Sequence, residues 1–214
     1  MKQLATVFSL LIFITSAAWA QETGGGRAVD DERGAIEFIE NLAAETQAIW
    51  SDSQFSAQER SDAFRGLFEQ ATDIRILARG MLGRHYRTIS NEQKTDYMNA
   101  MRDFIVTEFD KRMEQIGFKS LDVVGTTPAS GRRGHLFVKT QVLRDEGEPI
   151  LVDWRVRKKA GKFQIINMDF EGINLMITNR DLFAAKVKKT GVEGLISWLK
   201  AQAASPVVTA SSSE

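Results

Sequence analysis

The sequence contains no cysteine, two histidines and three prolines among 214 residues, and its 28 basic side chains are matched by 28 acidic ones. Without cysteine the chain cannot form disulfides, zinc–thiolate sites, iron–sulfur clusters or a cysteine nucleophile. Two histidines are too few for a three-histidine metal centre. Balanced charge excludes the binding of nucleic acid by bulk electrostatic attraction, because that mode needs many unneutralised Lys and Arg side chains.

The first twenty residues have the three-part pattern of a secretory signal peptide. Lys2 supplies a positive start, residues 4–18 are almost entirely apolar or small, and Ala18-Trp19-Ala20 forms a small-x-small cleavage site. This apolar run is shorter than the about 20 residues that a transmembrane helix needs, and no later segment is long enough. We therefore expect cleavage after Ala20 and an exported mature chain without a transmembrane span.

The rest of the chain is predicted to form one domain with short polar ends. Residues 21–30 contain three consecutive glycines and lack periodicity, so they predict a flexible leader. Residues 205–214 are small and polar and predict a disordered tail. The single domain between them spans residues 31–204.

The first half of this domain, residues 31–117, is predicted to be mainly helical. It has no proline, and its apolar residues recur at three-to-four spacing. Ser56 and Ser90 are each followed three residues later by Glu or Gln, which is a capping box at a helix start. Gly83 and Gly117 are placed where a glycine commonly ends a helix.

After residue 117 the apolar period changes to two, which predicts strands over residues 118–178. Short separators rich in Gly, Pro and Asp favour an antiparallel meander, since parallel strands need long crossovers. Apolar residues point to both sides of the fourth strand, at Ile165, Ile166, Met168 and Phe170. This strand is therefore expected either to be covered on both faces or to face an apolar ligand. Residues 179–204 return to helical spacing, and the whole order predicts an α+β fold.

The sequence offers no set of catalytic residues at usable spacing. Asp153 and Asp169 lie on predicted strands, and either could act as a general base in a desolvated pocket. Strand alternation alternatively places Asp153 on the solvent face. Neither a nucleophile elbow nor a metal-binding His-Glu-x-x-His helix is present. We therefore predict a protein that is not an enzyme.

Two stretches resemble the MlaC family, also called the toluene-tolerance family. Residues 76–88, ILARGMLGRHYRT, followed by Asn91-Glu92-Gln93, are similar to its "LGRYWRTAT" segment. Residues 149–155, PILVDWR, and the later motifs FQI, EGINL and NRDLF are similar to the family's C-terminal end. This sequence departs at His85-Tyr86, Phe163 and Asn174, where the family has Tyr-Trp, Trp and Ser.

The resemblance covers residues 31–202 and implies a periplasmic phospholipid-binding shuttle. It implies a helical subdomain on a nuclear-transport-factor-2-like cone, with an apolar pocket between them. The implied partners are phospholipid, an inner-membrane ABC transporter complex and an outer-membrane lipoprotein complex, in maintenance of outer-membrane lipid asymmetry. We expect a monomer with no cofactor other than its lipid cargo, and no nucleic acid or metal.

Candidate lipid-binding residues are chosen as apolar positions on the long helix and on the strands that it must cover: Met81, Met98, Met101, Phe104, Val152, Trp154, Ile165, Met168 and Met176. Candidates for headgroup contact or partner docking are Arg79, Arg84, Arg87 and Arg180. Three alternatives stay open at this stage: a carrier of hopanoid or another lipid, a secreted enzyme of the same cone fold with Asp153 or Asp169 as base, and a docking adaptor without a ligand.

Overall fold

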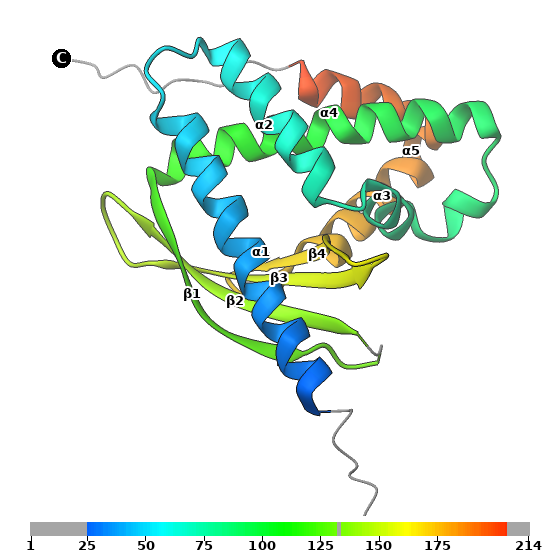
Figure 1. Ribbon diagram of the computed structural model, residues 1–214. Coiled ribbons are helices and arrows are strands. Elements are labelled where there is room, and N and C mark those ends of the chain that lie inside the picture. Colours follow the sequence, from blue (N-terminus) through cyan, green and yellow to red (C-terminus); the bar gives the residue numbers. More distant parts are fainter. Residues whose placement is uncertain (1–24, 132–133, 205–214) are drawn as a thin grey trace, which may run out of the picture.

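A computed structural model of the chain describes residues 25–131 and 134–204 and shows helices, then a sheet, then a final helix (Figure 1). The expected signal peptide, residues 21–24 of the expected leader and the expected tail 205–214 lie outside the described residues. The elements are α1 Gly25–Ser51, α2 Ala57–Ala71, α3 Ile74–Leu82, a 3₁₀ helix Gly83–Arg87, α4 Asn91–Ile116, β1 Phe118–Pro128, β2 His135–Arg144, β3 Ile150–Lys159, β4 Lys162–Phe170, β5 Ile173–Asn174 and α5 Leu175–Ala203. This order confirms the predicted α+β class.

Capping interactions define the helix ends where the sequence predicted them. The side chains of Ser56 and Ser90 each accept a hydrogen bond from the backbone N–H three residues on, and the Glu or Gln at that position accepts one from the serine N–H. Both capping boxes are confirmed. Gly83 and Gly117 follow α3 and α4 with φ angles of 59° and 60°, a region that glycine adopts at little cost.

The predicted start of the first helix is wrong. Residues 25–30 belong to α1 and are not a flexible leader. Helix-forming charged residues follow the glycines, and Arg33 pairs with Asp30 one turn away at 2.8 Å. Because the next turns of α1 bury Ala35 and Ile39 against the sheet, the helix is anchored there and extends back toward the N-terminus.

The predicted start of the last helix is also wrong, by four residues. The helix α5 begins at Leu175, whereas the sequence pattern placed its start at residue 179. The side chain of Asn174 accepts a hydrogen bond from the backbone N–H of Ile177 at 3.0 Å and so caps the helix directly after β5.

The five strands follow one another in the sheet in the order β1-β2-β3-β4-β5, each antiparallel to its neighbour, which confirms the predicted meander. The β3–β4 hairpin turns at Ala160 and Gly161, both with positive φ, as a two-residue hairpin turn of type I′ requires. An irregularity between β3 and β4 lies opposite Arg155, and both Ile165 and Ile166 are buried there. The strand β4 contacts α1, α2, α3 and α5, as expected for a strand covered on both faces.

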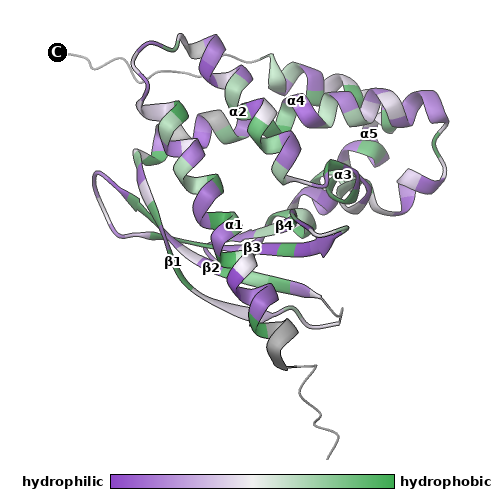
Figure 2. Ribbon diagram, viewed as in Figure 1, coloured by the Kyte–Doolittle hydropathy of each residue, from purple (hydrophilic) through white to green (hydrophobic). Residues whose placement is uncertain are grey.

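The helices cover the sheet without forming one continuous core. Figure 1 shows α1 crossing one face of the sheet, while α4 lies beyond it against the C-terminal part of α5. In Figure 2 hydrophobic segments of the helices alternate with hydrophilic ones, as expected for helices with one buried face. The buried residues form three clusters: one joins α3, α4 and α5, one joins α1 to the sheet, and one lies on β2 and β3.

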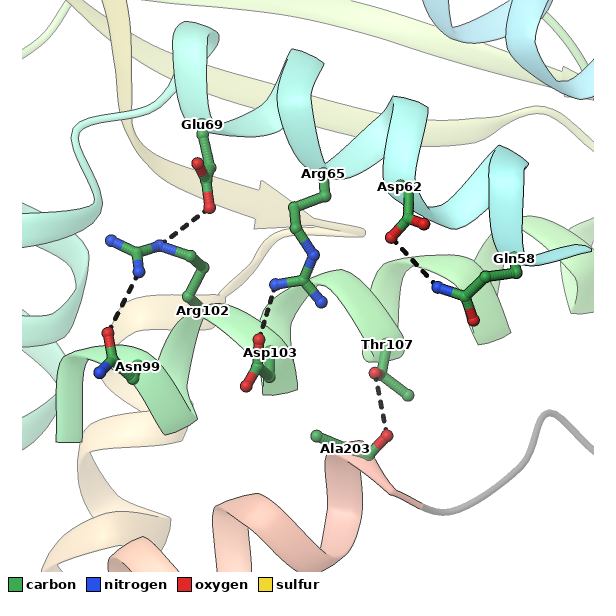
Figure 3. A network of polar contacts seen from close by, with 9 residues as sticks. All are labelled: Gln58, Asp62, Arg65, Glu69, Asn99, Arg102, Asp103, Thr107 and Ala203. Atoms are coloured by element: carbon green, nitrogen blue, oxygen red, sulfur yellow. Dashed lines mark hydrogen bonds and ion pairs between the residues drawn. The ribbon is translucent and has the colours of Figure 1, made fainter. Parts of the chain in front are cut away.

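Ion pairs join α2 to α4 along their exposed sides (Figure 3). Arg65 pairs with Asp103 at 2.6 Å, and Glu69 pairs with Arg102 at 2.9 Å. The hydroxyl of Thr107 on α4 donates a hydrogen bond to the last turn of α5 at 3.2 Å. These contacts fix α2 and the C-terminal end of α5 against α4.

Gly191 interrupts α5 with φ 71° and ψ 178°, a conformation essentially restricted to glycine. We expect Gly191→Ala to lower the free energy of unfolding by about 1–3 kcal/mol. Gly66 in α2 is the matched control, since nothing lies within 4 Å of a Cβ added there. Gly66→Ala should raise the free energy of unfolding by up to about 1 kcal/mol, because alanine is favoured over glycine inside a helix. Urea denaturation measures both, and equal stability of Gly191→Ala and wild type would contradict the backbone argument.

Candidate functional site

An apolar cavity lies between the sheet and the helices. It has about 1470 Å³ of space free of protein atoms, part of it open to solvent. All five α-helices and strands β1–β4 contribute to its wall, and each of the three hydrophobic clusters reaches it, through Met81, Ile39 and Val142 respectively. The cavity therefore occupies the place where a single core would otherwise close.

Six of the nine candidate lipid-binding residues line this cavity: Met81, Phe104, Val152, Trp154, Ile165 and Met168. They come from α3, α4, β3 and β4, so elements far apart in sequence meet at one surface. The alternation on β3 and β4 explains this, because Val152 and Trp154 lie on the same face of the sheet as Met168 across the β3–β4 ladder.

The other three candidates, Met98, Met101 and Met176, do not line the cavity. They pack in or against the cluster that joins α3, α4 and α5. Met101 is fully buried, and its sulfur lies 3.8 Å from the Tyr97 hydroxyl oxygen. The side chain of Met176 lies so close to Gly80 that a Cβ there would be 2.5 Å from the sulfur. These methionines join helices to one another and are not part of the cavity wall.

Trp154 presents an apolar ring to the cavity because its polar edge is satisfied within the sheet. Its indole N–H donates to the hydroxyl of Thr140 at 3.0 Å, and that hydroxyl donates to the backbone carbonyl of Val152 at 2.8 Å. Thr140 is buried, so this chain of hydrogen bonds is shielded from water and fixes the ring.

The nine candidates include no wall residue from α1, α2, β1, β2 or α5, and none of the polar residues of the wall. The apolar wall residues of the first two helices include Ile39, Leu42, Phe64 and Phe68. Their helical spacing indicated that each helix has a buried face, but it did not indicate that this face lies against a cavity. The polar residues on the wall are Thr46, Thr72, Glu108, Arg112, Asn167 and Asn179. The spacing of Glu108, Arg112 and the apolar Phe109 and Ile116 on one side of the long helix was a signal available in the sequence.

None of the four candidate arginines lines the cavity. Arg79, Arg84, Arg87 and Arg180 are exposed on α3, on the 3₁₀ helix and on α5. The Nε of Arg180 donates to the carbonyl of Gly80 at 2.8 Å and so ties α5 to α3. The structure gathers these side chains on neighbouring elements at the surface.

Asp153 and Asp169 face each other across β3 and β4 but lie outside the cavity wall. Asp153 and Asp169 form the pair next to Trp154 and Met168 on these strands. Because successive side chains of a strand point to opposite faces, the two carboxylates lie on the other face of the sheet. Partial burial and the negative charge of Asp153 raise the pKa of Asp169, while a hydrogen bond from Asn174 opposes this shift. The carboxylate pair is therefore separated from the apolar cavity by the sheet itself.

Among the residues that the structure describes, no group of three or more His, Asp or Glu side chains could hold a metal ion. Within the same ranges no helix has both the length and the hydropathy to cross a membrane.

The fold and cavity define a class of protein: a helix-covered antiparallel sheet that encloses an apolar space. A family model described as "MlaC protein" matches residues 40–201, and the chain belongs to this family. A solved structure with the same fold is the phospholipid-binding protein from Ralstonia solanacearum, determined in complex with a phospholipid. It is 19% identical, has a TM-score of 0.67, and the match covers 79% of this chain and 97% of that one.

We expect Asp169→Asn to raise the thermal midpoint at pH 7 and to have little effect at pH 3. Because the pKa of Asp169 is raised in the folded protein, ionisation of this carboxyl group disfavours the folded state. The stability contributed by the protonated carboxyl is fully present below the unfolded-state pKa of about 3.9, and it is lost as the pH rises through the folded-state pKa. Thermal denaturation followed by circular dichroism at both pH values measures the difference. Asp122→Asn, on the exposed edge strand β1, serves as the control. An Asp169→Asn effect that is larger at pH 3 than at pH 7 would contradict the assignment.

Proposed function

We propose that this protein binds a phospholipid with its acyl chains inside the apolar cavity and carries it through the periplasm. The observation that carries the proposal is the cavity itself, whose wall is formed by aliphatic and aromatic side chains from every layer of the fold. Membership of the MlaC family and a structural neighbour described in complex with a phospholipid support the same cargo. The proposed contacts to the acyl chains are Met81, Phe104, Val152, Trp154, Ile165 and Met168.

The energetics of acyl chains favour a carrier that exchanges its cargo while docked. Two chains contain on the order of 30 methylene groups, and each contributes about 0.8 kcal/mol when it leaves water. The gross transfer free energy therefore exceeds about 20 kcal/mol, which is at the limit of non-covalent affinities before ordering costs are subtracted. Release into water is then very slow. The lipid must pass directly from one apolar site to another.

We propose that the docking partners are an outer-membrane lipoprotein complex and an inner-membrane ABC transporter complex, in the maintenance of outer-membrane lipid asymmetry. The N-terminal pattern of a secretory signal peptide and the family support a periplasmic location between them. The exposed residues Arg79, Arg84, Arg87 and Arg180 are proposed to contact partner proteins, since they lie on the surface and outside the cavity wall.

A pair of adjacent alanines in α1 provides a direct test. Ala43 lines the cavity, whereas its neighbour Ala44 is exposed and does not. Ala43→Phe should place a ring in the cavity and reduce the fraction of protein that copurifies with phospholipid at least tenfold. Ala44→Phe makes the same chemical change on the other side of the helix and should retain wild-type loading. Native mass spectrometry of freshly purified protein reads the bound mass directly.

Several outcomes would contradict the proposal. Wild-type protein that is free of lipid and takes up none from phospholipid vesicles would exclude a lipid carrier. A bound mass of polycyclic size in place of a phospholipid would show that the cargo is a hopanoid. Wild-type loading in Ala43→Phe as well as in Ala44→Phe, with both variants folded by circular dichroism, would show that the lipid does not occupy this cavity.

A further inference from the structure

We infer that Arg112 binds the phosphate of the cargo's headgroup at the mouth of the cavity, an assignment that rests on the proposed function. Arg112 lies in the C-terminal half of α4, and it is the one exposed side chain among the described residues of the cavity wall. An exposed residue of an otherwise covered wall marks where the cavity meets solvent. A lipid whose chains fill the cavity leaves its polar end there.

An aromatic side chain holds the guanidinium at this opening. The Arg112 Cζ lies 5.4 Å from the centroid of the Phe170 ring, which is itself part of the wall. This is a cation–π distance, and stacking on a ring orders the side chain before any ligand binds. Because its orientation is fixed in advance, less rotamer entropy is lost when the guanidinium binds an anion.

The positive charge of Arg112 is not neutralised by a neighbouring carboxylate that the structure describes. The nearest candidate by helix spacing is Glu108, one turn earlier on the same wall. Glu108 is instead paired with Lys111 at 3.3 Å, and Lys111 also donates to the carbonyl of Gln202 on α5 at 3.4 Å. No ion pair within 4.0 Å joins Arg112 to a carboxylate of the described residues. Among the described side chains, Arg112 is therefore a cation at the mouth without an ion-pair partner.

The guanidinium suits a phosphate in both charge and shape. Its planar fork donates two parallel hydrogen bonds to a pair of phosphate oxygens, which a lysine ammonium cannot do in the same geometry. The exposed arginines on α3, on the 3₁₀ helix and on α5 lack this combination, because they are outside the cavity wall. The chemistry recognised at Arg112 is thus a phosphate diester or monoester attached to an acyl-bearing body.

A competition between two lipids with identical acyl chains tests the inference. Lipid-stripped protein is incubated with vesicles that contain equal amounts of phosphatidylglycerol and diacylglycerol, and native mass spectrometry gives the ratio of the two bound masses. The wild-type protein should favour the phospholipid by about tenfold, the lower range for hydrogen bonds to a charged group. Arg112→Gln should reduce this ratio about tenfold while diacylglycerol still loads. Arg112→Lys should give an intermediate ratio.

Arg84→Gln tests the competing headgroup candidate at the surface. The matched control is Arg75→Gln, which removes an exposed arginine of α3 outside the cavity wall and should keep the wild-type ratio. A folded Arg112→Gln variant with the wild-type ratio overturns the inference and leaves the proposed function standing. If Arg84→Gln loses the preference for phosphatidylglycerol and Arg112→Gln keeps it, the inference about Arg112 is overturned in favour of the surface arginines. Wild-type protein that loads neither lipid overturns both the proposed function and this inference.

The phosphate could also come from solution, and calorimetry separates the two sources. Inorganic phosphate is titrated into lipid-stripped wild-type protein and into Arg112→Gln. We expect no binding tighter than millimolar in either, because the acyl chains supply most of the affinity and a single exposed arginine supplies little. Sub-millimolar binding that depends on Arg112 would assign the site to the free anion and overturn the headgroup inference.

Discussion

The structure depends on keeping an apolar space open between a sheet and the helices that cover it. Empty apolar volume is unfavourable, because the atoms around it lose dispersion contacts that a packed core would supply. The wall must therefore be held by contacts made elsewhere. Ion pairs fix α2 to α4, the Tyr97 hydroxyl donates to the carbonyl of Ala78 to join α4 to α3, and Met176 packs closely on Gly80 to join α5 to α3. None of these contacts requires side chains to fill the cavity.

This arrangement explains why the buried residues fall into separate clusters. The cluster formed by α3, α4 and α5 is a helical core in its own right, with Phe183 and Trp198 packed edge to face at 6.3 Å. The contacts of α1 with Val138 and Val156 form a second core on the sheet. Both clusters contribute residues to the cavity wall, so a ligand in the cavity adds contacts to both. A bound lipid thus completes the hydrophobic core and stabilises the folded state for as long as it is bound.

Sequence patterns predicted the elements well and the cavity only in part, for a physical reason. Capping boxes at Ser56 and Ser90 and the change of period after Gly117 are local signals, and local signals determine element type and ends. Phe104 and Met101 are three residues apart on one helix and both are buried, yet only Phe104 reaches the cavity. Periodicity reports that a residue faces the interior. It does not report whether that interior is packed or hollow, because this depends on where α1 and α2 lie.

The apolar wall and the one exposed charged residue of the described wall, Arg112, can distinguish different parts of a lipid. Methylene groups contribute nearly the same free energy in every lipid, so an apolar wall retains acyl chains without distinguishing the molecules to which they belong. Discrimination between lipids with the same chains must come from the polar end, and Arg112 is the charged residue that the wall exposes there. A single cation stacked on Phe170 is enough to favour a phosphate while leaving the retention time to the chains. Additional cations at the mouth would strengthen the contacts to the headgroup, which have to break when the lipid is exchanged.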